Sequence, residues 1–348
     1  MARAEKALEA HRYSHARADY QAILQSEPEN RDAKIALIRI HIAQENPDYA
    51  VRILDGMEDR GTRTRALRLL RAVALLMLGR FDDAMAVVAQ DPSAEAWRIR
   101  AIAQAGRNDL GQVAYAFESG SRAPGNRARL LADFAHFRLS QGDIGGAAAL
   151  AKQAVGTDET DENALLVAGN VEMVSKRPRA ALSWYTRAAR IYPESRPALM
   201  GRIAMLAELK QFDKVAALIE AGRVLRPEDT ELLYFEALLA AERKDWAQAR
   251  ALLQPYEDRM EQMPAASVLY AEALIRLEQV DLARSRLSSQ LLRDPDNCKV
   301  RVLLAEAKLA GDDAEGALET LAPVAGWTDA TPQELALLAE AQAQASGA

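Results

Sequence analysis

Small apolar residues recur along the chain at intervals of 34 residues. One series consists of Ala16, Ala50 and Ala84. A longer series consists of Ala147, Ala181, Val215, Ala249, Ala283 and Ala317. A turn-like stretch precedes each of these residues. The residue three positions before each of them is apolar or a proline. A unit of this length predicts a pair of helices. A lone helical pair cannot bury its apolar face, so each pair must stack on the next one. We therefore predict small residues where consecutive helices cross closely.

Proline marks the same period near the end of several units. Pro193 and Pro227 are one interval apart, and Pro295 follows two intervals later. The clearest unit covers residues 162–195 and carries Leu165, Ala168, Gly169, Ala181, Tyr185, Ala188 and Pro193. A 34-residue pair of helices closed by proline resembles the tetratricopeptide repeat family, over almost the whole chain and in about ten units. The resemblance implies an all-α fold, a right-handed α-solenoid of antiparallel helix pairs.

The spacing divides the chain into four regions. We expect N-terminal units over residues 1–90, regular units over residues 126–330, and a capping helix with a tail over residues 331–348. Residues 91–125 are expected to form an irregular, shortened unit, because Asp91-Pro92 ends a helix early. The capping helix has a clear start, with Thr331 as N-cap, proline next and a glutamate three residues after the cap.

The first unit is incomplete, because its first helix would begin before Met1. This suggests a segment of a longer protein, or a chain trimmed after an export signal. The N-terminus itself lacks the apolar region of a signal peptide. Cys298 is the one cysteine, which fits the cytoplasm and a disulfide-free exported protein equally well. The compartment stays open, with an exported or periplasmic location favoured over a cytoplasmic one.

Composition excludes several classes of partner. Hydrophobic residues make up 49% of the chain but aromatic residues only 5%, so alanine, the strongest helix former, supplies much of the apolar content. The formal net charge of −6 leaves no basic footprint for nucleic acid. The longest strongly apolar stretch, residues 72–78, is too short to cross a bilayer, so we expect no direct membrane insertion.

No residue pattern indicates catalysis, a cofactor or a metal. His11 and His15 are four residues apart, but no third and fourth ligand accompany them, and they fall on a turn and on the helix after it. The glycines at residues 142–146 belong to a turn between two repeat helices rather than to a phosphate loop. We therefore expect a chain that is not an enzyme and that binds no cofactor.

A basic cluster has two interpretations. Residues 60–71 contain five arginines without one acid: Arg60, Arg63, Arg65, Arg68 and Arg71. Because the last three recur at every third residue, they share one side of a helix. Guanidinium groups suit an anionic ligand, but long arginines also cover apolar neighbours on an ordinary solvated face. The solvated face is the favoured interpretation, and a site for an anionic ligand at the early units is the alternative.

The family resemblance also implies where a partner would lie. In tetratricopeptide arrays the first helix of each unit lines the concave side, and one face of each such helix repeats as i, i+3, i+7 and i+10. Asn163 and Asn170 on this stripe resemble asparagines that grip a peptide backbone, although the lysines that complete such a clamp are missing. The candidate partner-binding residues from the stripe and the basic cluster are Arg39, Arg65, Arg68, Arg71, Arg129, His136, Asn163, Asn170, Met173, Met200, Tyr234 and Glu272.

These observations favour a non-catalytic scaffold or adaptor that holds a peptide or protein partner in a concave groove. Two alternatives stay open. One is a bacterial envelope scaffold for exopolysaccharide export or outer-membrane assembly. It rests on a loose resemblance to the alanine- and arginine-rich repeat arrays of such systems, without a shared motif. The other is a regulatory arm of a larger enzyme, which would fit the truncated start. The partner's identity and the oligomeric state do not follow from the sequence.

Overall fold

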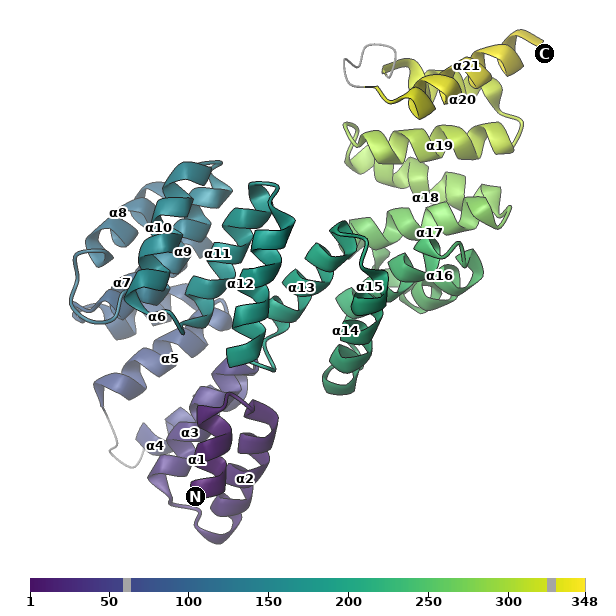
Figure 1. The fold of residues 1–348 in the computed structure, drawn as a ribbon. Helices are drawn as coiled ribbons and strands as arrows, with labels where there is room; N and C mark the ends of the chain where they lie inside the picture. Colours follow the sequence, from purple (N-terminus) through teal and green to yellow (C-terminus); the bar gives the residue numbers. More distant parts are fainter. Residues whose placement is uncertain (59–63, 324–329, 348) are drawn as a thin grey trace. The chain divides into compact units, whose positions relative to one another are not determined.

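The computed structural model describes residues 1–58, 64–323 and 330–347. These residues contain helices and turns and no β-strand. The chain forms two compact units, residues 1–211 (unit 1) and residues 212–348 (unit 2). Figure 1 shows antiparallel helix pairs stacked one on the next within each unit. The fold is therefore an all-α solenoid, as predicted.

Unit 1 contains thirteen α-helices in the described residues. They are α1 (Ala2–Glu9), α2 (Tyr13–Ser26), α3 (Arg31–Ala43), α4 (Pro47–Glu58), α5 (Arg65–Met77), α6 (Phe81–Val88), α7 (Ala94–Gly106), α8 (Leu110–Gly120), α9 (Ala128–Ser140), α10 (Ile144–Thr157), α11 (Glu162–Val174), α12 (Pro178–Ile191) and α13 (Arg196–Glu208). Odd-numbered helices are the first helices of their pairs and even-numbered helices the second.

Unit 2 continues the alternation, with even-numbered second helices and odd-numbered first helices. Its helices are α14 (Phe212–Leu225), α15 (Thr230–Glu242), α16 (Trp246–Leu253), the 3₁₀ helix η1 (Gln254–Gln262), α17 (Pro264–Arg276), α18 (Val280–Arg293), α19 (Cys298–Ala310), α20 (Ala314–Leu321) and α21 (Pro332–Gly347). Many helices in both units begin after Asn, Asp, Ser or Thr, whose side-chain oxygen accepts a bond from a backbone N–H of the first turn, as Asp161 does from Ala164 at 3.0 Å.

The turn inside each helix pair repeats in backbone conformation. The residue there has a positive φ, which lets the chain close the first helix and reverse. The positions are His11, Glu45, Gly79, Asn108, Gly142, Lys176, Lys210, Lys244, Glu278 and Asp312. They follow the 34-residue period except between Gly79 and Asn108, where five residues are missing. The irregularity therefore falls in the pair that contains α6, which is only eight residues long.

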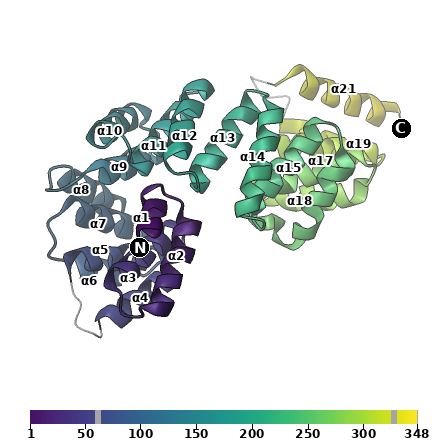
Figure 2. The same ribbon diagram turned by 60° about the horizontal axis from the view of Figure 1, so that its bottom comes forward.

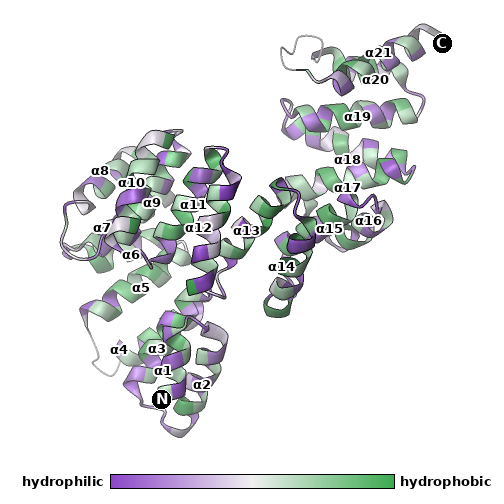
Figure 3. Cartoon of the chain, viewed as in Figure 1, coloured by the Kyte–Doolittle hydropathy of each residue, from purple (hydrophilic) through white to green (hydrophobic). Residues whose placement is uncertain are grey.

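The periodic alanines lie at the helix crossings. Ala16, Ala50, Ala84, Ala147, Ala181, Ala249, Ala283 and Ala317 are all fully buried, and Val215 is 2% exposed. The prediction of small residues at close crossings is confirmed. Figure 3 shows hydrophobic and hydrophilic residues alternating along the helices, as expected for stacked amphipathic helices that are covered on one side and open to solvent on the other.

The predicted start of the last helix is also confirmed. The hydroxyl of Thr331 accepts a bond from the backbone N–H of Glu334 at 3.3 Å, and the Glu334 carboxylate accepts from the Thr331 N–H at 2.7 Å. This reciprocal arrangement satisfies backbone donors that a helix start leaves open. Ala341 of α21 is buried against Ala317 and Leu321 of α20.

Candidate functional site

Unit 1 contains a groove of about 680 Å³ at the N-terminal ends of α5, α7, α9 and α11. Its lining residues are Arg65, Ala66, Leu69, Ser93, Glu95, Pro124, Gly125, Asn126, Arg129 and Asp161. We call this the unit 1 groove. All four helices are first helices of their pairs. The structure thus brings together two of the predicted partner-binding residues, Arg65 and Arg129.

Arg65 is held by a carboxylate from the loop after α6. Its Nε and Nη2 atoms donate to the two Asp91 oxygens at 2.8 and 2.7 Å. The Arg65 guanidinium, together with bonds from Ser93, holds the pKa of Asp91 well below its usual range. Arg65 is therefore already neutralised within the chain, although its side chain is still half exposed.

A buried ion triad supports the floor of the groove. The Arg98 guanidinium donates to Glu95 at 2.8 and 2.9 Å and to Asp133 at 2.8 Å, and only 7% of Arg98 is exposed. Burial raises the pKa of Glu95, but the attraction of Arg98 outweighs it and the net shift is downward. Glu95 therefore stays ionised, and its orientation is fixed by Arg98.

At the far edge of the groove Arg129 lies beside Asp161, the N-cap residue of α11. The Nε atom of Arg129 lies 3.4 Å from Asp161, and 58% of the Arg129 side chain is exposed. Burial raises the pKa values of Asp161 and of its neighbour Glu162 above their ordinary values. Arg129 is thus more open to a further anionic group than Arg65, because its single long contact leaves most of its donors free for other bonds.

The turn between α1 and α2 lies against the turn between α12 and α13, as both views of the ribbon show (Figures 1 and 2). The Ser14 N–H and hydroxyl donate to the Glu194 carboxylate, the N–H at 3.0 and 3.1 Å and the hydroxyl at 2.8 Å. The ring of His11 packs on that of Tyr192 with centroids 4.1 Å apart. We call these contacts the N-terminal clip; it joins the first and the last helices of unit 1.

The remaining arginines of the basic cluster differ in their surroundings. Arg71 is ion-paired with Asp55 at 2.8 Å and with Glu58 at 3.0 Å, and its side chain is largely buried. Arg68 is exposed and has no ion-pair partner within the described part of the chain. Arg60 and Arg63 lie outside the described residues. The geometry therefore accounts for Arg65 and Arg71 by contacts inside the chain.

The predicted stripe residues of unit 1 are not all available to a partner. Arg39 and His136 are exposed, and Asn163 is half-buried. The Tyr185 hydroxyl donates to the side-chain amide oxygen of Asn170 (Oδ1) at 2.6 Å, so that oxygen is occupied. Met173 of the same helix is 37% exposed. Met200 is only 8% exposed. The expectation that Met200 contacts a partner does not fit this burial, because the side chain packs inside the stack.

The two predicted stripe residues of unit 2 lie on different first helices. Tyr234 on α15 is half-buried, and burial raises the pKa of its hydroxyl. Glu272 on α17 is ion-paired with Lys299 of α19 at 3.4 Å.

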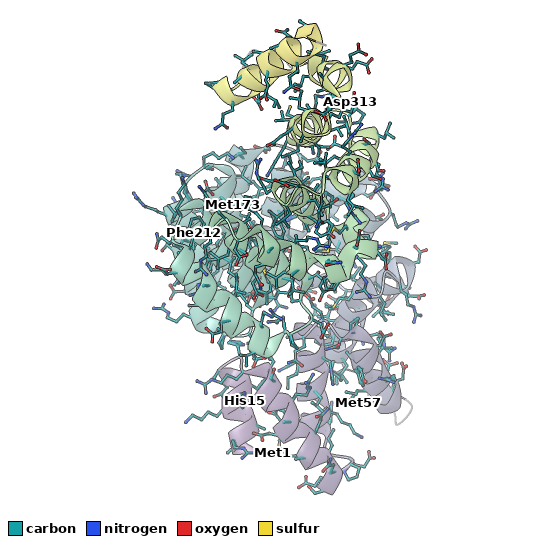
Figure 4. The ribbon with its side chains drawn as sticks, turned by 90° about the vertical axis from the view of Figure 1, so that its right-hand side faces the viewer. Met1, His15, Met57, Met173, Phe212 and Asp313 are labelled. Carbon is teal, nitrogen blue, oxygen red and sulfur yellow. The ribbon has the colours of Figure 1, made fainter. Side chains whose placement is uncertain are left out.

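The candidate metal ligands of the N-terminal hairpin form no cluster in the described residues. His15 lies on the N-terminal hairpin (Figure 4), and residues 1–58, 64–323 and 330–347 hold no group of three or more His, Cys, Asp or Glu side chains that could bind a metal ion. Across these residues no helix is both long and apolar enough to span a bilayer.

Sequence reasoning missed the acidic half of the unit 1 groove. Glu95 and Asp161 stand at helix starts, where an acidic residue is explained by the helix dipole alone. Asn126 lies between α8 and α9, and an asparagine outside a helix does not by itself indicate a binding site. A sequence signal was available in the alternation of arginine and acid at successive helix starts, but it indicates a shared groove only once the helices are aligned.

Three family models match parts of the chain. Two describe tetratricopeptide repeats, over residues 7–72 and residues 133–196. The third describes a bacterial type III secretion protein (HrpB1_HrpK) and matches residues 190–306. At the level of sequence the chain matches no curated protein.

Solved structures of similar fold cover much of the chain at low identity. A tetratricopeptide repeat protein from Parabacteroides merdae is 14% identical with a TM-score of 0.55, and the match covers 72% of this chain and 98% of that one. The Cut9–Hcn1 hetero-tetramer of the APC/C gives 13% identity and a TM-score of 0.55, over 97% of this chain and 95% of that one. Pseudomonas aeruginosa PilF gives 17% identity and a TM-score of 0.53, over 62% of this chain and 97% of that one.

At these sequence identities the structural matches support the fold alone. They agree with the 34-residue period of the alanines, with the repeated turn conformation and with the two repeat models. The chain therefore contains tetratricopeptide repeats, over residues 7–72 and 133–196, and it has the fold of tetratricopeptide repeat proteins.

Proposed function

We propose that this chain is a non-catalytic protein-binding scaffold and that the unit 1 groove holds an extended segment of a protein partner. The observation that carries the proposal is the groove itself, a space of about 680 Å³ bordered by the starts of four successive first helices. Tetratricopeptide repeat proteins are in general scaffolds for protein partners, which supports this class of function.

The chemistry of the groove suits a polypeptide of mixed charge. Arg65 and Arg129 are balanced by Asp91, Glu95 and Asp161, so the groove has no strong net sign. Ser93 and Asn126 add polar atoms that suit the backbone amides of an extended segment. A carboxylate of the partner would bind at Arg129, where most of the guanidinium is exposed.

The test combines cross-linking with a charge variant. A photoreactive amino acid replaces Ala66, which is exposed and lines the groove, and a control chain carries it at Ala149, exposed on the second helix α10. A partner captured at residue 66 and not at residue 149 supports the proposal. Its affinity should fall about tenfold in Arg129→Ala and as salt rises.

The control for charge is Arg179→Ala, which removes an exposed arginine from the second helix α12. If Arg179→Ala weakens binding as much as Arg129→Ala does, the effect comes from net charge and the groove is not the site. Equal cross-linking at residues 66 and 149 would lead to the same conclusion.

A second candidate function is a part in bacterial envelope machinery. It is favoured by the match of residues 190–306 to the type III secretion family model. This alternative predicts an exported or envelope-associated chain that co-purifies with components of a secretion apparatus. Fractionation of cells that produce the tagged chain tests it: recovery in the cytoplasm without such components argues against it.

A further inference from the structure

Unit 2 contains a groove of about 600 Å³ between the second helices α14 and α16, with α15 as its floor. We call it the unit 2 groove. Its apolar lining residues include Ile219 and Val224 of α14, Leu239 of α15 and Leu252 of α16. Val224 is 81% exposed. A valine left this open beside an apolar groove is a surface that a partner can bury.

The helix α16, which lines one side of the groove, is shorter than the second helices before and after it. The second helix α14 runs for fourteen residues, and so does α18. The helix α16 between them ends after eight residues, at Leu253, and is followed by the 3₁₀ segment η1, in which Pro255 stands at the second position. Because proline has no N–H to continue the ladder, the helix cannot extend past this point. The chain therefore continues after Leu253 as the 3₁₀ segment η1 and not as further turns of α16.

This groove is not on the stripe that was predicted to face a partner. Its lining residues on α15 are Glu236, Leu239, Ala240 and Arg243, which share one helical face. The predicted stripe of α15, which includes Tyr234, Leu238 and Ala241, lies on another face of the same helix. The unit 2 groove thus opens toward the second helices, and a ligand there would not compete for the first-helix stripe.

Of the charged residues at the rim of the groove, two form an ion pair with each other and two are exposed. Arg223 is ion-paired with Glu236 across the groove. Glu220 on α14 and Arg243 after α15 are exposed, and neither has an ion-pair partner among the described residues. Since α15 runs antiparallel to α14, Arg243 stands at the end of the groove where α14 begins, and Glu220 stands farther along it. The open rim charges are therefore of opposite sign and at separate places.

We infer that the unit 2 groove binds an amphipathic helix of a protein partner. All three walls are helices, whose backbone groups are already paired, so an extended peptide would place unpaired amides on an apolar floor. A helix satisfies its own backbone and can lay an apolar ridge between α14 and α16. Its polar edge carries a basic side chain opposite Glu220 and an acidic one opposite Arg243. This surface lies beyond the proposed function, because that function concerns unit 1.

The probe is a phage-displayed library of fourteen-residue helical peptides with leucines fixed at i, i+4 and i+7 and the other positions randomised. The library is selected on the full chain, and enriched peptides are synthesised and measured by fluorescence anisotropy. Val224→Glu removes an apolar contact and should weaken binding about tenfold or more. Because Val224 is 81% exposed, the variant should fold as the wild type does.

The matched control is Leu292→Glu. Leu292 is 83% exposed and occupies in α18 the position that Val224 occupies in α14, but it does not line the unit 2 groove. The inference is supported by peptides that lose affinity for Val224→Glu and keep it for Leu292→Glu. It is supported further if selection on Arg243→Glu enriches peptides with a basic residue in place of the acidic one. The inference is overturned if no peptide is enriched, or if both variants weaken peptide binding equally.

Sedimentation velocity separates a partner helix from a second copy of this chain. If the wild type self-associates and Val224→Glu abolishes the association, the groove binds another copy and the inference is wrong. Arg129→Ala in unit 1 should leave peptide binding unchanged, so a failure of the unit 1 proposal and a failure of this one give different results.

Discussion

The carboxylate of Glu194 caps the helix that begins at Tyr13, although 180 residues separate Glu194 from Ser14, to which it bonds. The residue before α2, Arg12, makes no side-chain bond to the first turn of the helix. Glu194 supplies the missing acceptor for the Ser14 N–H and hydroxyl. A helix start that its own sequence leaves uncapped is therefore completed by the other end of unit 1.

Replacing Glu194 with alanine should open the N-terminal clip. The Ser14 N–H loses its acceptor, so its hydrogen exchange should become faster, together with that of the first turn of α2. Hydrogen-exchange mass spectrometry over residues 10–18 measures the effect. Glu208→Ala, a change at an exposed glutamate of α13, is the control and should leave this exchange unchanged. Unaltered protection of Ser14 in Glu194→Ala would show that the clip does not hold the hairpin in solution.

Enlarging an alanine at a helix crossing should destabilise the stack. Ala181 and Ala283 are fully buried, and leucine in either place forces the helices apart at a cost of about 1–3 kcal/mol in the free energy of unfolding. Urea denaturation measures it. Ala217→Leu on the exposed side of α14 is the control and should change the free energy little. Wild-type stability in both variants would mean that the crossings have room that the structure does not show.

Two glycines should respond to alanine in opposite directions. A Cβ atom added to Gly169 would lie 2.6 Å from the ring of Tyr185, so Gly169→Ala should cost about 1–3 kcal/mol of unfolding free energy. Gly156 in α10 has nothing within 4 Å of an added Cβ atom. Gly156→Ala should instead stabilise the helix, by up to about 1 kcal/mol, because alanine is the better helix former. Melting curves of both variants test the pair, and a shift of the same sign in both would contradict it.

Alkaline pH should weaken unit 1 through its buried tyrosines. Burial raises the pKa values of Tyr13, Tyr185 and Tyr192 to about 12. A raised pKa means that the folded chain keeps these protons more tightly than the unfolded chain, in which tyrosine titrates near 10. The stability they contribute is fully present below about pH 10 and is lost as pH rises toward about 12. Tyrosinate absorbance, followed alongside helicity, checks this; ionisation of all tyrosines near pH 10 with the fold intact would contradict it.

The sequence by itself determined the repeat and hence the fold. Alanines such as Ala181, 34 residues from the next, identify helix crossings because only a small side chain allows a close approach, and this requirement is local to each pair. The cap of Thr331 and Glu334 was equally readable, because its donors and acceptors are three residues apart.

Only the tertiary structure decided which side chains meet. Arg65 appeared as part of an open basic cluster, but the packing of α6 on α5 brings Asp91, in the loop after α6, to Arg65 and neutralises it. Ser14 and Glu194 meet because the rotation between successive pairs accumulates over unit 1 until its two ends touch. Such contacts depend on the sum of many small rotations between helix pairs, and the residues that meet do not by themselves indicate these rotations. The repeat is therefore legible in the sequence, while the grooves and their charges are a property of the assembled stack.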